Sequence, residues 1–590
     1  MAAPDVSSLF AQAERAFAEG QLEHARDLVG RVLRVTGDHP AVLHLLALVE
    51  KKRGAMEAAR AAFERARRLA PRDPQILGNY ANLLGETGAT EEALARYEDA
   101  LRADPAFLPA RYNRALLLQK MGRFAEALSD LDRVLAGSPA DARTLSARAS
   151  LLRDLGRYGE AAASYDAALR AEPARPIALK GRARVALERG EEDASEHYRR
   201  ALAAMPDAPE LQLGYAEALE ADGRPDALDA LTAAVARAPD WIEGQSALAR
   251  MRWEAGEGEA FTRDMERRLA EAPGNAALWA ALAATLRAAD LPERAAEAAA
   301  EARRAQPDDP ALMLAEAFHA SEAGELERST ALFAALPEGL SGRAGLEARH
   351  CLRCGDLARA AVWTDLARAE NPEDIAAWAM TGLVWRLSGD PQAEWLNGQP
   401  GLLSTSALDL DPSQIASVAE RLRTLHRTRA HPIGQSLRGG TQTRGRLLAR
   451  EEPDIRLLQT ALSRVIDSYW NALPAEDPAH PLLRQRAKRP QFAGSWSVRL
   501  TGGGFHVAHF HSQGALSSAC YFVVPEAQAP MEGWLELGVA PAEFGLDLEP
   551  LARVEPKPGR IALFPSYLFH GTRPFSAGER LTVAFDVIAR

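Results

Sequence analysis

The chain has 590 residues, of which 47% are hydrophobic and 26% charged, the composition of an ordinary soluble globular protein. Its length exceeds what one core supports and predicts at least two domains. The net charge of -11 disfavours general binding to nucleic acid, and three cysteines are too few for a disulfide framework. No run of about 18 apolar residues predicts a membrane span, and the N-terminus lacks the basic and apolar regions of a signal peptide. We therefore expect a cytoplasmic protein without a membrane or nucleic-acid partner.

The N-terminal two thirds of the chain repeats itself. Prolines return at steps of 33 or 34 residues, at Pro71, Pro105, Pro139, Pro173, Pro206, Pro239, Pro273 and Pro307. Small residues keep a common phase at Ala59, Ala93 and Ala127, and large ones at Phe63, Tyr97, Leu131 and Tyr165. A fixed period of this length predicts stacked structural units.

One unit, Gln75–Pro105, shows what each repeat contains. Apolar residues recur at helical spacing, Gly88 falls between two helices, and Pro105 ends the second. This pattern resembles the tetratricopeptide repeat, most closely from about residue 41 to 310. We expect residues 1–395 to form an α-solenoid whose concave groove binds a protein or peptide. The alternative is an array that serves only as a scaffold or an oligomerisation surface.

The period is lost near residue 400, where Gly, Pro, Asn, Ser and Asp accumulate. We expect a linker at 396–432 and a second domain at 433–590. The stretch 421–450 holds eight arginines and no acidic residue, which favours either an anionic ligand or partner, or a solvated face that pairs with the acidic array. An amphipathic helix is predicted at Pro453–Leu473.

From Gln491 onward the sequence changes to short β-strands separated by turns. Strands are predicted at Ser495–Leu500, Phe505–His511, Ser517–Val524, Gly533–Leu537, Arg560–Phe564 and Arg580–Ile588. Short strands at this spacing are typical of a sandwich or barrel of the jelly-roll type. The expected fold class is therefore multidomain α + β.

Histidines in this domain have the spacing of metal ligands. Alternate side chains of a strand share a face, so His509 and His511 can point at one ion, with His570 as a third imidazole from a distant strand. Three such ligands on one side of an iron leave the other positions open. His506 has the opposite parity and would point away if the strand is regular.

These residues resemble the iron(II)/2-oxoglutarate-dependent oxygenases. That family carries His-x-Asp/Glu, a distal His and an Arg about ten residues further on, here His509-Phe510-His511, His570 and Arg580. The similarity is closest to a bacterial subgroup with tetratricopeptide repeats before the oxygenase, through the segments HPIGQSLRGGTQT, WSVRL, GGFHVAHFH, LSSACYF and LFPSYLFHGTRPF. It implies a double-stranded β-helix, Fe(II) as cofactor, 2-oxoglutarate and O2 as co-substrates, and hydroxylation of a C–H bond coupled to oxidative decarboxylation.

The resemblance also assigns residues to 2-oxoglutarate. Arg580 and Thr582 share strand parity, and a buried guanidinium beside a hydroxyl is a good receptor for a carboxylate. The family's pattern gives both to the distal carboxylate of 2-oxoglutarate. Tyr521 stands where similar enzymes place a tyrosine that reaches the same carboxylate.

The chain departs from the family at His511, where most members have a carboxylate. Three interpretations stay open: all three histidines ligate, only His509 and His570 ligate with water in the third place, or the site is degenerate. His506 could replace one ligand if the strand carries a bulge.

Three functions follow from these patterns. The leading hypothesis is a hydroxylase whose repeats recruit a protein partner or substrate. The second is an interaction scaffold whose barrel has lost catalysis. The third is an enzyme acting on a small molecule or glycan, with the repeats serving assembly only.

Overall fold

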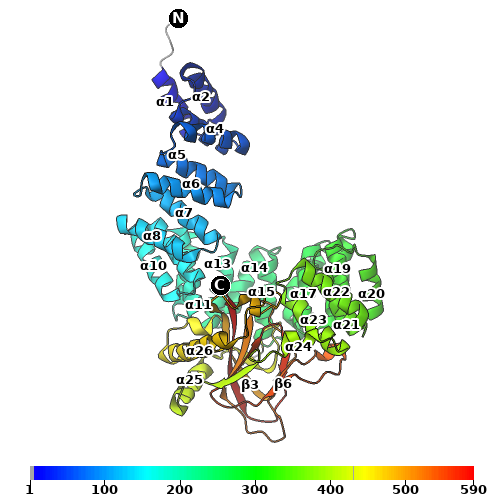
Figure 1. Ribbon diagram of the computed structural model, residues 1–590. Helices are drawn as coiled ribbons and strands as arrows, with labels where there is room; N and C mark the ends of the chain where they lie inside the picture. Colours follow the sequence, from blue (N-terminus) through cyan, green and yellow to red (C-terminus); the bar gives the residue numbers. More distant parts are fainter. Residues whose placement is uncertain (1–5, 429–430, 590) are drawn as a thin grey trace. The chain divides into compact units, whose positions relative to one another are not determined.

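The computed structural model describes residues 6–428 and 431–589. These residues divide into two compact units, with the boundary between Val185 and Ala186. The first unit consists of helices packed as successive antiparallel pairs (Figure 1). They are α1 (Val6–Ala18), α2 (Leu22–Thr36), α3 (Pro40–Lys52), α4 (Met56–Leu69), α5 (Pro74–Glu86), α6 (Thr90–Ala103), α7 (Leu108–Lys120), α8 (Phe124–Gly137), α9 (Ala142–Asp154) and α10 (Tyr158–Ala171), followed by α11 (Pro176–Arg189), which contains the boundary.

The local chemistry of each pair explains its boundaries. Asp73 caps α5 by accepting hydrogen bonds from the backbone N–H groups of Gln75 and Ile76, and Pro74 occupies the first helical position. Gly88 turns the chain between α5 and α6 with φ +84°, a conformation that favours glycine. Ala59 and Ala93 are fully buried where helices cross. The predicted helical repeat is therefore present.

The second unit continues with the same kind of pair. Its helices are α12 (Ala194–Ala204), α13 (Pro209–Ala221), α14 (Ala227–Arg237), α15 (Ile242–Glu254), the 3-10 turn η1 (Gly258–Thr262), α16 (Arg263–Glu271), α17 (Ala276–Ala288), α18 (Pro292–Ala305), α19 (Pro310–Glu322), α20 (Leu326–Ala335), α21 (Arg343–Arg353), α22 (Leu357–Glu370), α23 (Ile375–Ser388) and α24 (Gln392–Asn397). Within the described residues, no helix combines the length and apolar character needed to cross a membrane.

The rest of the second unit is built on antiparallel sheets. A six-stranded sheet has the order β1-β7-β4-β9-β3-β2 and a three-stranded sheet the order β6-β5-β8. The strands are β1 (Ser404–Ala407), β2 (Leu437–Gln442), β3 (Pro490–His506), β4 (Leu516–Val523), β5 (Leu535–Leu537), β6 (Ala552–Val554), β7 (Arg560–Pro565), β8 (His570–Thr572) and β9 (Glu579–Ala589). Short 3-10 turns are η2 (Leu447–Ala449), η3 (Leu483–Gln485) and η4 (Ala542–Phe544).

Two helices accompany these sheets, α25 (Pro412–Leu425) and α26 (Pro453–Ala472). Helix α26 confirms the amphipathic helix predicted at Pro453–Leu473, and its apolar side joins a core with sheet residues such as Phe585 and repeat residues such as Trp378. The segment 396–432 contains β1 and α25, and β1 pairs with β7 at the edge of the six-stranded sheet.

The strand predicted at Phe505–His511 is wrong after its first two residues, which belong with the strand predicted at Ser495–Leu500 to one continuous strand. Strand β3 ends at His506, and His509 forms only an isolated bridge with His570. The chain leaves its neighbours in the large sheet after His506 and takes new backbone partners, His570 for His509 and Ser566 for His511. The segment thus crosses from one sheet to the other, which ends the regular alternation of side chains.

In the second unit, several repeats contact the sheet region through the C-terminal ends of their first helices. Ala221 O of α13 accepts from Arg427 Nη1 at 2.8 Å, and Ala288 O of α17 accepts from Gly434 N at 2.9 Å. Glu254 of α15 pairs with Arg444, and Asp290 after α17 pairs with Arg438. For these two arginines, the structure shows the predicted pairing with the acidic array.

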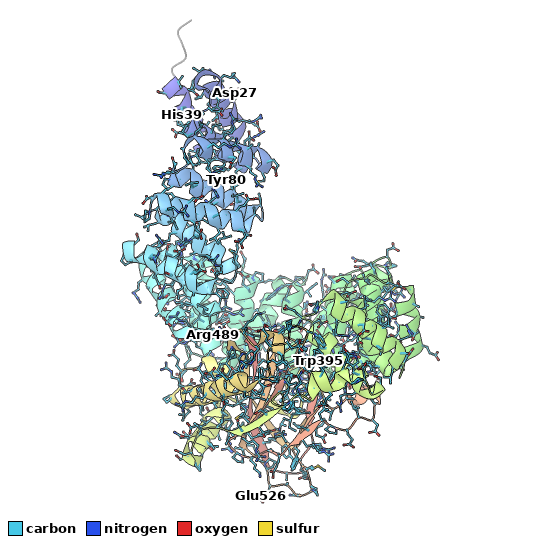
Figure 2. All side chains as sticks on the ribbon, in the orientation of Figure 1. Asp27, His39, Tyr80, Trp395, Arg489 and Glu526 are labelled. Atoms are coloured by element: carbon cyan, nitrogen blue, oxygen red, sulfur yellow. The ribbon has the colours of Figure 1, made fainter. Side chains whose placement is uncertain are left out.

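The last repeat is joined to the sheet region most closely. Trp395 of α24, labelled in Figure 2, donates from Nε1 to Asp477 Oδ2 at 2.8 Å and packs edge-on against His480. His480 Nε2 in turn donates to Leu396 O at 3.1 Å, and Tyr567 OH donates to the same carbonyl at 2.6 Å. The end of the repeats and the sheet region therefore share one core.

Candidate functional site

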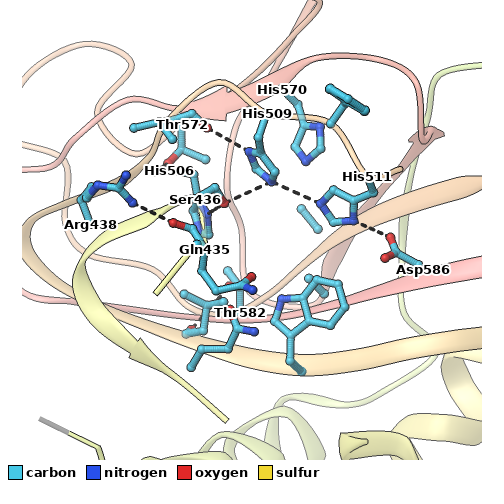
Figure 3. A pocket seen from close by; sticks show the side chains of 18 of the residues that line it. Gln435, Ser436, Arg438, His506, His509, His511, His570, Thr572, Thr582 and Asp586 are labelled. Atoms are coloured by element: carbon cyan, nitrogen blue, oxygen red, sulfur yellow. Dashed lines mark hydrogen bonds and ion pairs between the residues drawn. The ribbon is translucent and has the colours of Figure 1, made fainter. Parts of the chain in front are cut away.

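Three histidines meet where the two sheets adjoin (Figure 3). His509 and His511 follow β3, and His570 opens β8. One ring nitrogen of each lies within 4.8 Å of the others. The structure thus brings together the three residues that the sequence singled out as metal ligands.

The backbone explains why these side chains converge. His509 and His570 exchange two N–H···O hydrogen bonds, at 3.0 and 2.8 Å, so their side chains lie side by side with ring centroids 4.2 Å apart. Phe510 packs against Phe569, with ring centroids 5.1 Å apart. The aromatic pair anchors the residue between the two imidazoles.

Each of the three imidazoles is oriented through Nδ1. His509 Nδ1 lies 2.9 Å from Val507 O, His570 Nδ1 lies 3.0 Å from Leu568 O, and His511 Nδ1 lies 2.5 Å from Asp586 Oδ1. Carbonyl and ionised carboxylate oxygens only accept hydrogen bonds, so Nδ1 carries the proton and Nε2 keeps its lone pair. The second nitrogen of every ring is therefore available to a metal ion.

The spacing of the free nitrogens fits a metal ion. His509 Nε2 and His511 Nε2 are 3.2 Å apart. Two lone pairs facing each other repel unless a cation lies between them, and two nitrogens bound at about 2.1 Å and at right angles are about 3 Å apart. Imidazole suits Fe(II) among other transition metals, so the donor set fits the group that the sequence resemblance implies.

Burial keeps His509 and His570 neutral. Desolvation, reinforced by the neighbouring His511, lowers the pKa of His509 to about 3. Desolvation, together with the neighbouring His509 and His511, holds the pKa of His570 well below its usual value. Neutral imidazole is the form that binds metal, so these rings need lose no proton at neutral pH.

His506 also lines this cavity, whereas it was expected to point away only if the strand is regular. Its Nδ1 lies 2.9 Å from Ser436 Oγ, and its ring stacks on His509 with centroids 6.0 Å apart. The irregular backbone after β3 removes the parity argument. His506 does not belong to the three-histidine group among the described residues.

The residues expected to bind 2-oxoglutarate lie on β4 and β9. Arg580 is 2% exposed and stands over the ring of Tyr521, 5.1 Å from its centroid. Arg580 Nη1 donates to Gly533 O at 2.8 Å. The Arg580 guanidinium and the Tyr521 hydroxyl interact with each other, and Arg580 Nε and Tyr521 OH have no further hydrogen-bond partner in the described part of the chain. Unpaired buried polar groups are costly, so this cluster suits an anionic ligand. Burial lowers the pKa of Arg580 and raises that of Tyr521.

A cavity of about 570 Å³ connects these groups, and Arg580, Thr582 and the three histidines line it. Trp496 stacks on His511 at its wall, with ring centroids 5.7 Å apart. Arg287 and Asp290, which belong to the repeats, also line it. The repeats therefore contribute directly to the walls of the candidate site.

Two cavity residues were not anticipated from the sequence. Asp586 shares strand parity with Arg580 and Thr582, so the pattern could have placed it on the same face of β9. Ser436 precedes β2, and its Oγ lies 3.1 Å from His509 Nε2. No sequence signal predicted that approach, because it depends on a contact 73 residues apart.

Comparisons with known proteins agree with this geometry. A family model described as "Putative 2OG-Fe(II) oxygenase" matches residues 494–586. Models described as "Tetratricopeptide repeat" match residues 10–74, 84–151 and 146–209. No curated protein matches the chain.

Solved structures resemble the repeats. A tetratricopeptide repeat protein from Parabacteroides merdae is 21% identical, with a TM-score of 0.31, over 41% of this chain and 97% of that one. The C-terminal part of a repeat protein from Cytophaga hutchinsonii is 16% identical, with a TM-score of 0.35, over 40% of this chain and 99% of that one. The N-terminal region thus matches tetratricopeptide repeats, and residues 494–586 match the family described as "Putative 2OG-Fe(II) oxygenase".

Proposed function

We propose that the C-terminal domain is an Fe(II)/2-oxoglutarate-dependent dioxygenase, a hydroxylase, with the double-stranded β-helix fold. The observation that carries this proposal is the convergence of three imidazoles whose Nδ1 atoms are all engaged, with one ring nitrogen of each within 4.8 Å of the others. His509, His511 and His570 would hold the iron through Nε2. The two antiparallel sheets that adjoin at this site support the fold.

The co-substrate would occupy the neighbouring cluster. Arg580, with the hydroxyls of Thr582 and Tyr521, would receive the distal carboxylate of 2-oxoglutarate, because Arg580 Nε and Tyr521 OH lack other partners in the described residues. With O2, bound Fe(II) and 2-oxoglutarate supply the oxidation of a C–H bond. The chain's own part is to bind and orient these groups and to keep His509 and His570 neutral.

Among the three interpretations of His511, we favour ligation by all three histidines. A carboxylate holds His511 Nδ1, and an imidazole anchored in this way presents Nε2 in a fixed direction. Asp586 would also return a negative charge close to the position where most of the family has a ligating carboxylate. The two-ligand and degenerate sites remain as outcomes of the experiments below.

We further propose the division of the chain into repeats (1–395), a connecting segment (396–432) and the oxygenase domain (433–590). The protein or peptide partner would bind the repeats of the first unit, residues 6–185. Several repeats of the second unit already use the ends of their first helices to hold the sheet region. A non-catalytic scaffold is the alternative, favoured only by the histidine at position 511.

Anaerobic reconstitution with Fe(II) and 2-oxoglutarate tests the enzyme proposal through the visible charge-transfer band of the complex. We expect a band in the wild type, none in His570→Ala, and a band that needs far more 2-oxoglutarate in Arg580→Ala. His39→Ala, at an exposed repeat histidine, and Arg573→Ala, beside β8, are the controls and should behave as wild type. A folded wild-type protein with no band and no bound metal would contradict the enzyme proposal and favour the scaffold function.

A further inference from the structure

One turn of the repeat array departs from all the others that the structure describes. Between the first and second helix of each pair, the chain turns through a residue with positive φ. Eleven of these residues are glycines: Gly20, Gly54, Gly88, Gly122, Gly156, Gly190, Gly223, Gly256, Gly324, Gly355 and Gly389. The twelfth, between α17 and α18, is Asp290 with φ 59°.

Fold stability does not explain this aspartate. A left-handed backbone disfavours a residue with a side chain, although aspartate tolerates it better than most. Asp290 pairs with Arg438, but its side chain is 58% exposed and that of Arg438 is 23% exposed. One ion pair with so much solvent access contributes little, so glycine would serve the turn at least as well.

The partner of Asp290 controls a segment that we call the wall segment, residues 431–438. Arg438 Nη1 donates to Gln435 O at 2.7 Å and to Leu437 O at 2.8 Å, which fixes the turn before β2. Two further bonds tie the segment to the repeats: Gly434 N to Ala288 O, and Trp253 Nε1 to His431 O, both at 2.9 Å. The wall segment thus lies against α15 and α17.

The wall segment faces the histidines (Figure 3). Gln435, Ser436 and Arg438 line the cavity. Ser436 Oγ lies 2.9 Å from His506 Nδ1 and 3.1 Å from His509 Nε2, and Ser436 O accepts from Val507 N at 2.9 Å. A hydroxyl this close to a candidate ligand nitrogen can hydrogen-bond an oxygen ligand of a bound metal. The segment lies outside residues 494–586, the part that the oxygenase family model matches.

We propose that Asp290 is a positioning residue of the oxygenase site: through Arg438 it fixes the wall segment so that Ser436 meets an oxygen ligand of the metal, water or the keto acid. The inference rests on the proposed function. If Asp290 has this role, one repeat is a structural part of the site. The α17–α18 turn would then carry an aspartate in place of the usual glycine because the aspartate maintains the geometry of the cavity.

The test uses full-length protein, with Mn(II) and 2-oxoglutarate as probes. Asp290→Gly gives the turn its usual residue and removes the carboxylate; Asp290→Asn keeps a left-handed-tolerant side chain without charge. We expect both to weaken 2-oxoglutarate binding to the Mn(II)-loaded protein about fivefold in calorimetry. In Asp290→Gly the unfolding midpoint should be unchanged or higher. Hydrogen exchange at residues 431–438 should quicken without any ligand.

The matched control is Gly324→Asp, which places aspartate in the same turn of the next repeat. It should lower the unfolding midpoint and leave binding unchanged. In a double-mutant cycle, Asp290→Gly and Arg438→Met should not add, because both act through one contact.

Equal 2-oxoglutarate affinity and equal exchange in Asp290→Gly and wild type would overturn this inference and leave the proposed function intact. Additive effects of the two substitutions would also overturn it. Failure of the wild type to bind Mn(II) would instead reject the proposed function, and this inference with it.

Discussion

The three site imidazoles differ in what holds them. His509 and His570 are fixed by backbone carbonyls, whereas His511 is fixed by the side chain of Asp586. Asp586 is itself held, since Ser517 Oγ donates to its Oδ1 at 3.0 Å. A side-chain anchor can be removed by mutation, which makes the role of His511 testable.

Asp586→Ala should weaken Mn(II) binding about 10- to 100-fold, the usual effect of losing a partner of a ligating histidine. Asp586→Asn keeps an acceptor oxygen for Nδ1, so it separates orientation from charge: near-normal binding would show that orientation suffices. The measurement is a titration followed by electron paramagnetic resonance. If Asp586→Ala binds Mn(II) as the wild type does, His511 is not a ligand.

Outside the site, the buried His350 gives the protein an acid-sensitive position. His350 of α21 is 1% exposed, with Nδ1 2.9 Å from Ser321 Oγ and Nε2 2.8 Å from Thr330 Oγ1. Burial, together with the charge of Arg359, lowers the pKa of His350 to about 4. The folded state therefore takes up this proton later than the unfolded state as the pH falls.

Because the unfolded chain protonates near pH 6.5, the second unit should lose stability as the pH falls from about 6.5 to 4, by on the order of 2 kcal/mol for this residue. Urea unfolding at pH 7 and pH 5 measures the loss. His350→Gln should be less stable at pH 7 but less sensitive to acid, while His39→Gln, at an exposed histidine, should keep the wild-type dependence. An unchanged acid sensitivity in His350→Gln would contradict this account.

At the scale of elements, the repeats depend on close helix contacts. Gly214 of α13 lies against the ring of Tyr198 of α12, and an added Cβ would overlap that ring. Helical Gly345 of α21 has no atom within 4 Å of its would-be Cβ. The two glycines have the same helix propensity but opposite packing environments.

Gly214→Ala should destabilise the protein by about 1–3 kcal/mol, because the cost of overpacking exceeds the gain in helix propensity. Gly345→Ala should stabilise it by roughly 0.5–1 kcal/mol, since nothing opposes the propensity gain. Urea unfolding monitored by circular dichroism compares them. Changes of the same sign in both would mean that the contact with Tyr198 does not decide the outcome.

The segment after Leu500 shows a limit to predicting strands from the sequence. The sequence predicted one strand at Ser495–Leu500 and another at Phe505–His511, but a single strand, β3, covers the first and ends at His506. A local sequence pattern predicts which side chains of a strand share a face. It does not predict the residue at which the chain changes its hydrogen-bonded neighbour. The parity argument put His509 and His511 on one face, and the regular strand on which it depended for His506 ends at that residue.

At the scale of the molecule, the second unit places charged groups between repeats and sheet region. Arg444 Nη2 lies 2.8 Å from Glu220 Oε1 and also bonds Glu254, whose side chain is 1% exposed. Burial lowers the pKa of Arg444 to about 10 and raises that of Glu220. These costs are tolerable only while the three groups stay together.

Arg444→Met should destabilise the second unit by about 3 kcal/mol, because it leaves buried carboxylates without their main cation. Arg464→Ala is the control: Arg464 pairs with Asp409 at 2.9 Å, but the two side chains are 65% and 83% exposed, so at most about 1 kcal/mol should be lost. Thermal unfolding and limited proteolysis check both. Equal losses would show that burial of the pair does not matter.

The sequence alone determined the features that local chemistry fixes. The proline period, the glycine turns and the small residues at helix crossings predicted the repeats. Parity placed Arg580 and Thr582 on one face of β9, and the spacing of His509, His511 and His570 selected the residues that meet. Each of these signals lies within one element or repeats along the chain.

Only the tertiary structure decided what lies between elements. It set Asp586 behind His511, brought Ser436 to His509, and placed Asp290 of a repeat at the rim of the cavity. Asp290 and Arg438 are 148 residues apart, so no periodicity or spacing can join them. Contacts of this kind depend on how complete elements pack, because packing satisfies charge, shape and hydrogen bonding over the whole unit at once.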